Sequence, residues 1–567
     1  MSDIVSIVSA ILGGFILLYG LCSLVIKERL YLSEASVALV CGIIFGPVCA
    51  QFIDISKWGN ESLITHEFTR VVIAIQVMAT GVALPKAYLR KELSSILVLL
   101  GPVMLFMWLV SGLFVWALVP GLNFLEALMI AACFTPTDPV LANSIVQGKF
   151  AEKHVPTHVR HIISCESGAN DGLGYPFLFL AIYLLQMDAG PAIGKWAYWI
   201  MAYNVLLSIV IGLVAGFIAR KLLKYAEQKR FIDKESFLVF AVALALFLLG
   251  TVGLIGSDDL LACFVAGNSF TWNDWFRVET ERAHLMEVVD ILLNLSIFVY
   301  IGLTMPWSAF SSDDLQITVW RLVVLAILVL TLRRLPIVLA LYKWIPAIHN
   351  WREAVFTGWF GPIGVGAIFY YTVALEALPE DGPNTHARAL LQPVIYFMVL
   401  ASVIAHGVTI PLFYIGTFAT RTLTITSEKG NQVLRIPKIE SLIGRKQSPA
   451  IIDEVYKSDL PSSPPLPPSP PLKEDIDRDV PKKHTAITIL TPQIPEHVHN
   501  PNSSNNNYTV YHNNNNNYTK SNNDDRLGVA GSATAVQVDE YDIDDDDESI
   551  SYLPISRKSS LSHRSKS

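Results

Sequence analysis

Apolar segments of roughly 20 residues recur along most of the chain and are separated by short polar connections. Between Ile4 and about Phe418 we count about thirteen such segments, including a short one after Asp259, and this length suits a hydrocarbon core of ~30 Å. Only helices and closed barrels satisfy their backbone groups inside a bilayer. The pattern therefore predicts an all-α polytopic membrane protein, with its transmembrane domain over residues 1–420.

The charges in the connections predict how the segments are oriented. Alternate connections are rich in bases, whereas the connections between them hold few bases and several acids. The basic connections contain Lys27, Arg90, Lys153, Arg220, Arg277, Arg282 and Lys343. By the positive-inside rule the N-terminus lies outside and the C-terminus inside, which requires an odd number of spans. The first segment has no basic n-region and no small-residue cleavage site, so we expect a retained helix.

The composition changes abruptly after Arg421. The whole chain is 52% hydrophobic and 16% charged, a balance that excludes a soluble domain. Residues 421–567 instead contain a proline-serine run, an asparagine-rich stretch and the acidic block Asp539–Glu548. Such a segment buries too little apolar surface to fold, so we predict a mostly disordered cytosolic tail. Its Arg557–Ser560 stretch resembles a kinase site, which makes kinases or other cytosolic regulators candidate partners.

The remaining features of the composition exclude other classes of partner. The net charge of −7 comes mainly from the tail and does not indicate nucleic-acid binding. The six cysteines lack metal-ligand spacing, so no metal cofactor is predicted. The chain also has no Gly-x-x-x-x-Gly-Lys-Ser/Thr loop, and a nucleotide-driven pump is therefore not indicated.

Two acidic motifs interrupt apolar segments. One is Thr135-Pro136-Thr137-Asp138-Pro139, and the other is Glu166-Ser167-Gly168-Ala169-Asn170-Asp171. An ionisable group near the bilayer centre costs several kcal/mol, so it is retained where it binds an ion, relays a proton or pairs with a partner. A single acid of this kind is as well explained by a structural ion pair as by a functional site. Three acids in one short stretch favour a functional site.

The spacing of these motifs places them near the middle of the membrane. Asp171 lies ten residues after His161, which corresponds to about 15 Å of helix. Pro136 and Pro139 disfavour helical geometry at the residue before each, so we expect Thr135 and Asp138 to leave the helix. The result is an unwound stretch whose free carbonyl groups and hydroxyl must line a polar cavity.

A second interrupted helix is predicted late in the chain. Gly361-Pro362-Ile363-Gly364-Val365-Gly366 lies centrally in the apolar run from Ala354 to Leu375. If the spans are numbered from one to thirteen, the two broken segments are the fifth and the twelfth. Such a pair, one in each half of the protein, indicates a transporter site built from inverted repeats.

The eleventh apolar run supplies positive charge. Arg333 and Arg334 lie near the middle of the run from Val319 to Ile345, and a buried guanidinium requires a carboxylate. Glu166 is the acid available at a similar depth, and either arginine could pair with it. Because Asp171 is rotated by about 140° from Glu166 around a helix, Glu166 can serve an ion pair while Asp171 faces a different surface.

Together these motifs resemble the sodium/proton exchanger branch of the monovalent cation/proton antiporter superfamily. The stretches from Phe134 to Val140 and from Ser164 to Gly172 are most similar to the fungal plasma-membrane alkali-cation/proton antiporters. The resemblance implies inverted repeats with two broken, crossing helices. It also implies a plasma-membrane homodimer, in which an ion-carrying core domain moves against a dimerisation domain. Aligning Arg-Leu-Pro with the family pattern favours Arg334 as the partner of Glu166.

The resemblance also assigns a role to a third acidic motif. Asp258 and Asp259 match a functionally important acidic pair in those antiporters. They lie at a predicted outer boundary of the membrane. At this place the sequence is equally compatible with two roles: auxiliary acids that admit cations, or solvated loop acids.

The predicted function is secondary active antiport, not enzymatic catalysis. Asp171 is the predicted carrier, binding in turn a proton or a partly dehydrated Na⁺, Li⁺ or K⁺. Oxygen ligands would come from Asp171, Asp138, Thr135, Thr137 and nearby carbonyl groups, while Asn170 orients the site. Exchange of cytosolic cation for external protons would serve salt tolerance and pH homeostasis.

Two other classes of function are compatible with parts of the sequence. A sodium-coupled symporter for an organic solute would show solute uptake without cation-evoked proton movement. A membrane scaffold that recruits partners through its tail would lose its role on truncation after Arg421, whereas a transporter would keep its ion flux.

Overall fold

The computed structural model describes residues 2–28, 32–53, 55–139, 141–142, 155–280 and 285–428. These residues all belong to one compact unit, Met1–Gly444. The described part is helical apart from one antiparallel bridge between Ser312 and Ile317. The bases Lys153 and Arg282, and the tail beyond Glu428 with its predicted disorder and kinase motif, lie outside the described residues.

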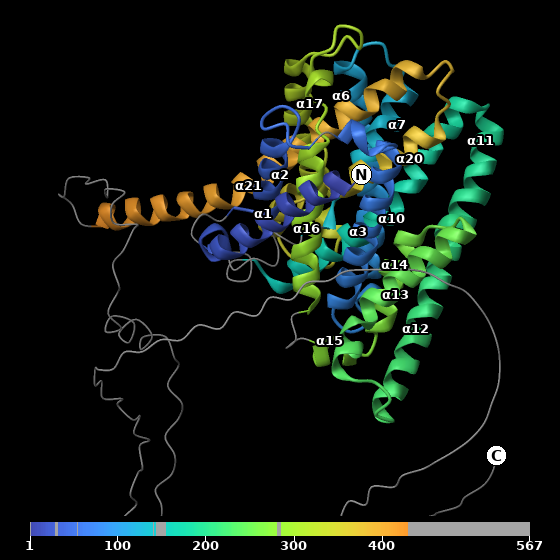
Figure 1. Ribbon diagram of the computed structural model, residues 1–567, viewed down its shortest axis with the longest axis vertical. Helices are drawn as coiled ribbons and strands as arrows, with labels where there is room; N and C mark the ends of the chain where they lie inside the picture. The colour runs from blue at the N-terminus through green and yellow to red at the C-terminus, as the bar shows by residue number, and fades with distance from the viewer. Residues whose placement is uncertain are drawn as a thin grey trace, which may run out of the picture. The chain divides into compact units, whose positions relative to one another are not determined.

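Figure 1 shows the helices in chain order. Their bounds are α1 Ser2–Glu28, α2 Glu34–Phe45, η1 Ile55–Trp58, α3 Glu61–Ala83, α4 Tyr88–Lys91, α5 Leu93–Val98, η2 Leu99–Val103, α6 Met104–Leu118, α7 Phe124–Phe134, α10 Thr157–Gln186, α11 Ala189–Lys195, η3 Trp196–Leu206, α12 Leu207–Gln228, α13 Lys234–Ile255, α14 Asp259–Phe270, α15 Trp275–Thr280, α16 Leu285–Leu303, η4 Trp307–Phe310, α17 Val319–Leu332, α18 Leu335–Leu341, η5 Tyr342–Trp344, α19 Trp351–Trp359, α20 Val365–Ala377 and α21 Thr385–Glu428.

Within the described ranges, seven helices are long and apolar enough to cross a membrane. Four further helices (α2, α7, α14 and α20) are apolar but shorter. Helices α3 and α10 correspond to two more of the predicted segments, and both carry charged side chains along their length. The short span predicted after Asp259 is α14. The last helix, α21, continues to Glu428, past the predicted domain boundary at residues 420 and 421.

Small residues let several of these helices pack closely. A Cβ added to Gly42 of α2 would lie 2.1 Å from the carbonyl oxygen of Val299 on α16. On α10, a Cβ added to Gly172 would lie 2.5 Å from Cβ of Leu261 on α14. Without hydrophobic driving force in lipid, such close backbone approach is a main source of association between helices. It holds α10 against α14.

The structure contains the two predicted breaks. Helix α7 ends at Phe134, and α19 and α20 are separated by residues 360–364. One detail of the prediction is wrong, because Thr135 keeps right-handed helical dihedral angles (φ −67°, ψ −44°). Its Oγ1 donates to the carbonyl oxygen of Ala131 at 2.8 Å. The unwound stretch therefore starts one residue later than Pro136 suggests.

A third break lies where a continuous eleventh helix was expected. Helix α17 ends at Leu332 and α18 begins at Leu335, so Arg333 and Arg334 occupy a bend between them. Pro336 in the first turn of α18 explains the interruption, since proline has no N–H to donate to the carbonyl group of Leu332, four residues earlier, and its ring clashes with that carbonyl group. Because of this bend, the side chains of the two adjacent arginines point in different directions.

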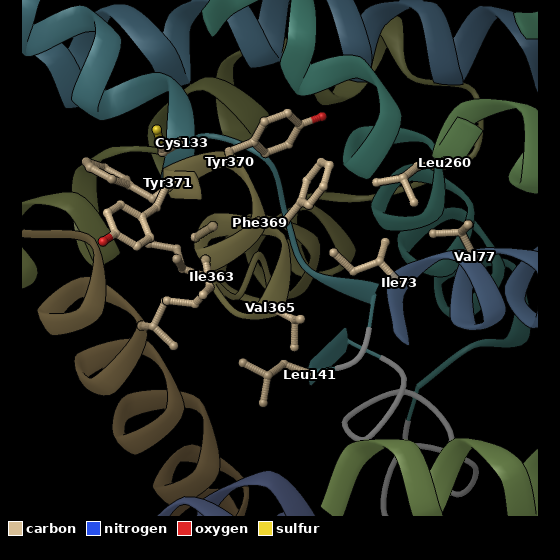
Figure 2. Close-up of a cluster of buried hydrophobic side chains, with 14 of the residues drawn as sticks. Ile73, Val77, Cys133, Leu141, Leu260, Ile363, Val365, Phe369, Tyr370 and Tyr371 are labelled. Carbon is tan, nitrogen blue, oxygen red and sulfur yellow. The ribbon is translucent and has the colours of Figure 1, made fainter. Parts of the chain in front are cut away.

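Apolar side chains pack around the breaks. Figure 2 shows this cluster, in which Ile73 and Val77 of α3 and Leu260 of α14 lie around Val365 and Phe369 of α20. All five are buried. The cluster excludes water from the region where the broken helices meet, which makes every polar group there costly unless it has a partner.

Candidate functional site

The two broken spans cross with direct backbone contact. The Asp138 N–H donates to the carbonyl oxygen of Pro362 at 2.9 Å. The Ile363 N–H donates to Ser402 Oγ of α21 at 2.7 Å, and His406 on the same helix contacts the carbonyl oxygen of Trp359 through Nε2 at 3.1 Å. Backbone groups released by the breaks are therefore bonded within the protein, as a lipid environment demands.

Arg333 neutralises the carboxyl ends of two half-helices. Its Nη1 donates to the carbonyl oxygens of Phe134 and Thr135, at the end of α7, and its Nη2 donates to the carbonyl oxygen of Gly361 at 2.6 Å. A cation is favourable at a helix C-terminus, where carbonyl groups are unpaired. Of the two arginines that the sequence offered as partners of Glu166, Arg333 therefore caps the crossing and bonds to carbonyl groups.

Arg334 forms the ion pair with Glu166. Its Nη1 contacts Oε1 of Glu166 and its Nη2 contacts Oε2 at 2.6 Å, while its Nε donates to the carbonyl oxygen of Thr357 at 3.0 Å. Both side chains are buried. The two-pronged geometry matches guanidinium to carboxylate, so the charge of Glu166 is compensated inside the protein.

Asp171 has no such partner. Its side chain is fully buried, and among the described residues neither Oδ1 nor Oδ2 has a hydrogen-bond donor. The neighbouring Asn170 is also buried, and its Oδ1 is unpartnered as well. Three acceptor oxygens from two consecutive residues are thus buried without a donor, a combination that folded proteins avoid unless a proton or an ion supplies the missing contact.

The amino end of α20 faces two carboxylates. Oδ1 of Asp138 accepts from the Gly366 N–H at 3.3 Å, and its Oδ2 accepts from the Leu141 N–H at 2.8 Å. Asp171 lies against the same turn, because a Cβ on Gly366 would meet its Oδ1 at 2.4 Å. The positive end of a half-helix favours negative charge or its exchange for a bound ion.

Hydroxyl groups connect the two acidic motifs. Asn170 Nδ2 donates to Thr137 Oγ1 at 2.9 Å, and Thr137 Oγ1 lies 3.1 Å from Ser167 Oγ. This network fixes the amide of Asn170 so that its Oδ1 and the carboxylate of Asp171 remain free. Thr135 contributes its carbonyl oxygen to Arg333, while its hydroxyl bonds within α7.

The third acidic motif lies at the start of α14. Asp258 and Asp259 are 3% and 7% exposed, so the reading of solvated loop acids is wrong. Oδ1 of Asp258 caps α14 by accepting from the Leu261 N–H at 2.9 Å, whereas its Oδ2 is buried and unpartnered. Oδ2 of Asp259 accepts from Arg70 Nε at 2.7 Å and from Arg70 Nη2 at 2.5 Å. Burial follows from the close packing of α14 against its neighbours.

A cavity of about 520 Å³ lies beside this motif and is lined in part by Asp259. We call it the vestibule. The side chains that line it include His66, Arg70, Tyr175, Asp259, Phe369 and Glu376. Tyr175 follows Asp171 by four residues, or about one helical turn. The vestibule is therefore lined by a residue about one turn along α10 from the unpartnered carboxylate.

Three aromatic residues connect the lining of the vestibule with Asp171. The ring centroid of Tyr175 lies 6.5 Å from that of Phe369 and 5.6 Å from that of Tyr370. Tyr370 Oη donates to the main-chain carbonyl oxygen of Asp171 at 2.5 Å. We call these three residues the aromatic layer: Tyr175 and Phe369 line the vestibule, and Tyr370 contacts both Tyr175 and the main chain of Asp171.

Sequence reasoning missed several polar residues near the site. Arg70 lies within the apolar run that becomes α3, and an intramembrane base is a signal that could have identified it. Asp290 on α16 accepts from Gln76 Nε2 at 3.1 Å, and Gln76 also donates to Asn294 Oδ1 at 2.6 Å. No local spacing links these residues, because they come from helices distant in sequence. Tyr370 resembled an ordinary core aromatic residue.

Comparisons with known proteins agree with this architecture. A protein of Schizosaccharomyces pombe named a probable Na⁺/H⁺ antiporter is 48% identical over 423 residues, which is 72% of this chain and 56% of that protein. The Na⁺/H⁺ antiporter of Saccharomyces cerevisiae is 41% identical over 76% of this chain and 46% of its own length. The chain thus spans about half the length of these two relatives.

Another relative is matched over nearly its whole length. A Na⁺/H⁺ antiporter of Schizosaccharomyces pombe is 36% identical over 73% of this chain and 91% of its own. Among solved structures, the sodium proton antiporter MjNhaP1 from Methanocaldococcus jannaschii has the same fold, with a TM-score of 0.54 at 18% identity, covering 70% of this chain and 98% of that one. Residues 14–415 match the transmembrane domain of the sodium/hydrogen exchangers. This chain, a multi-pass membrane protein, belongs to the sodium/hydrogen exchanger family.

Proposed function

We propose that this protein is a secondary antiporter that exchanges Na⁺, Li⁺ or K⁺ for protons by alternating access. The observation that carries the proposal is the fully buried carboxylate of Asp171, whose two oxygens have no hydrogen-bond donor beside the equally unpartnered Oδ1 of Asn170. An ionised carboxylate with no partner is strongly unfavourable in an apolar interior. Asp171 is therefore expected to hold either a proton or a cation at all times.

The available ligands suit a hard monovalent cation. Asp171 and Asn170 offer unpartnered oxygens, and the Thr137 hydroxyl is bonded to Asn170 at 2.9 Å. Hard cations prefer oxygen ligands. Asp138 supplies further negative charge next to the amino end of α20. Carbonyl groups of Thr135 and Gly361 are occupied by Arg333, so we assign them a structural role in the described conformation.

Coupling follows from competition for one carboxylate. A bound proton neutralises Asp171 and removes the attraction for a cation, while a bound cation leaves no site for the proton. If the site changes sides only when occupied, movement of one ion drives the other in the opposite direction. Glu166 takes no part in this exchange, because Arg334 neutralises it in place.

The vestibule provides access from one side. Its acids Asp259 and Glu376 attract cations, and Arg70 limits this attraction by pairing with Asp259. With the N-terminus outside, the vestibule opens to the exterior, since α3 begins and α20 ends on that side. Displacement of the aromatic layer would then connect it to Asp171.

Further features of the assembly also belong to this proposal. We propose a plasma-membrane homodimer with the tail beyond residue 420 in the cytosol, where kinases or other regulators would act on it. Cytosolic alkali cation would leave in exchange for external protons, which supports salt tolerance and pH homeostasis.

Proton movement evoked by cations in proteoliposomes tests the proposal. A pH-sensitive dye inside the vesicles should report exchange on addition of Na⁺, Li⁺ or K⁺ to the wild-type protein, and Asp171→Asn should abolish it. Asp274→Asn is the matched control, because Asp274 pairs with Arg277 at the surface at 2.7 Å. Exchange by Asp171→Asn at the wild-type rate would contradict the proposal.

A further inference from the structure

A second cluster of potential ligands lies at one end of the two helices that form the site. His158 is in the first turn of α10 and Glu353 is in the first turn of α19, while His349 lies in the connection before α19. One ligand atom from each residue lies within 4.8 Å of the other two. Within the described ranges, no other three His, Cys, Asp or Glu side chains converge in this way.

The geometry of the cluster suits a transition metal. His158 Nε2 lies 3.1 Å from Oε2 of Glu353, and the imidazole rings of His158 and His349 have centroids 4.2 Å apart with planes inclined by 33°. Two imidazoles and one carboxylate form a donor set typical of Zn²⁺. The side chain of His158 is 36% exposed, which gives a metal access and leaves room for a water ligand.

Surrounding hydrogen bonds hold the carboxylate in place. Asn350 Nδ2 donates to Oε1 of Glu353 at 2.7 Å, and the His349 N–H donates to Oε2 at 2.8 Å. Such outer contacts orient metal ligands and raise affinity.

We propose that His158, His349 and Glu353 form a binding site for a divalent transition-metal cation of the Zn²⁺ class. The site is chemically distinct from the one at Asp171, whose all-oxygen ligands suit alkali cations. A bound metal would join the start of α10, which carries Glu166 and Asp171, to the start of α19, which leads to the second break.

Cobalt spectroscopy on the purified full-length protein, prepared without a polyhistidine tag, tests the site. Co²⁺ should produce the absorption of a low-coordinate N/O site, and Zn²⁺ should displace it. The double variant His158→Gln/His349→Gln should lose one equivalent of tightly bound metal. The wild type and the double variant bind the same amount of metal elsewhere on the chain. The difference in bound metal between them therefore comes from this site alone.

His386→Gln is the matched control. His386 contacts the carbonyl oxygen of Pro120 at 3.2 Å, away from the cluster, so this variant should bind metal as the wild type does. A metal-free unfolding temperature equal to that of the wild type would show that the double variant is folded. Equal metal stoichiometry and an unchanged spectrum in the folded double variant would overturn the proposal.

A transport assay provides a second test of the site, and this test rests on the proposed antiport function. Zn²⁺ on the side of α19's first turn should slow cation-evoked proton movement in the wild type and should have no effect on the double variant. Exchange that resists Zn²⁺ in a protein that binds it would refute the inhibitory role of the site. A wild type without any exchange would refute the antiport proposal and leave the binding result intact.

Discussion

Two acids on helix α10 have the same burial and opposite surroundings. Glu166 is 1% exposed and Asp171 is fully buried. Both carboxylate oxygens of Glu166 receive the guanidinium of Arg334, whereas neither oxygen of Asp171 receives a donor. The difference comes from the partner helix: α10 presents Glu166 to the bend at Arg334 and presents Asp171 to the backbone of Gly366.

This comparison shows that burial alone does not identify a functional acid. Removing one member of a buried ion pair leaves an uncompensated charge, so Glu166 is expected to matter mainly for stability. An acid without a partner contributes little to stability but can exchange one ion for another. Substitution of Glu166 should therefore reduce mainly stability, whereas substitution of Asp171 should reduce mainly transport.

Glu166→Gln is expected to have the largest effect of the variants considered, and the property it lowers is the stability of the protein. The guanidinium of Arg334 would remain buried without its counter-charge, which costs about 3–5 kcal/mol for pairs of this kind. Thermal unfolding of the detergent-solubilised protein should occur at a clearly lower temperature than for the wild type or Asp274→Asn.

The reciprocal exchange Glu166→Arg with Arg334→Glu sharpens this test. Restored folding and exchange would assign the loss to the ion pair itself. If both single variants are inactive and the double variant is no better than either, the two residues act independently and the pairing does not explain their role.

A smaller effect, on transport more than on folding, is expected from Gly366→Ala. The new Cβ would meet Oδ1 of Asp171 at 2.4 Å, and overpacking of this kind costs typically about 1–3 kcal/mol. The carboxylate must move from its place, so cation-evoked proton movement should fall about tenfold or more. Gly101→Ala is the matched control, since nothing lies within 4 Å of its added Cβ. Wild-type exchange by Gly366→Ala would show that Asp171 tolerates displacement.

The smallest effect is expected from Thr137→Ala. It removes the hydroxyl that accepts from Asn170 Nδ2 at 2.9 Å, and a hydrogen bond of this kind is worth about 1 kcal/mol. The half-saturating cation concentration should rise several-fold while the maximal rate changes little. Thr137→Ser should behave as the wild type. An unchanged cation dependence in Thr137→Ala would mean that Asn170 does not need this contact.

The sequence located the break points but not their exact limits. Pro136 and Pro139 identified the first break, and the glycine-rich stretch around Pro362 identified the second. Thr135, just after the end of α7, kept helical dihedral angles. Its hydroxyl bonds back to Ala131, a local contact that the proline rule does not include. The break at Arg333 was missed, since the surrounding run is apolar and reads as one continuous span.

The sequence also identified the polar residues of the crossing, but the residues that each of them contacts did not follow from local patterns. Depth and chemistry could not distinguish Arg333 from Arg334, since the two residues are adjacent. Only the family resemblance favoured Arg334 as the partner of Glu166. It left Asp258 and Asp259 open between solvated loop acids and auxiliary acids, whereas the structure buries both at the start of α14. Their burial depends on helices that are far away in the sequence.

The sequence by itself determined which side chains lie in the membrane and where its helices must break, because hydropathy and proline geometry are local properties. Only the tertiary structure decided that Arg334 contacts both oxygens of Glu166, that Arg333 caps two half-helices, and that Asp171 is left without a donor among the described residues. Those outcomes depend on which surfaces meet across the crossing. A carboxylate's role is set by the charges and dipoles within a few ångströms of it, and here these come from helices distant in sequence.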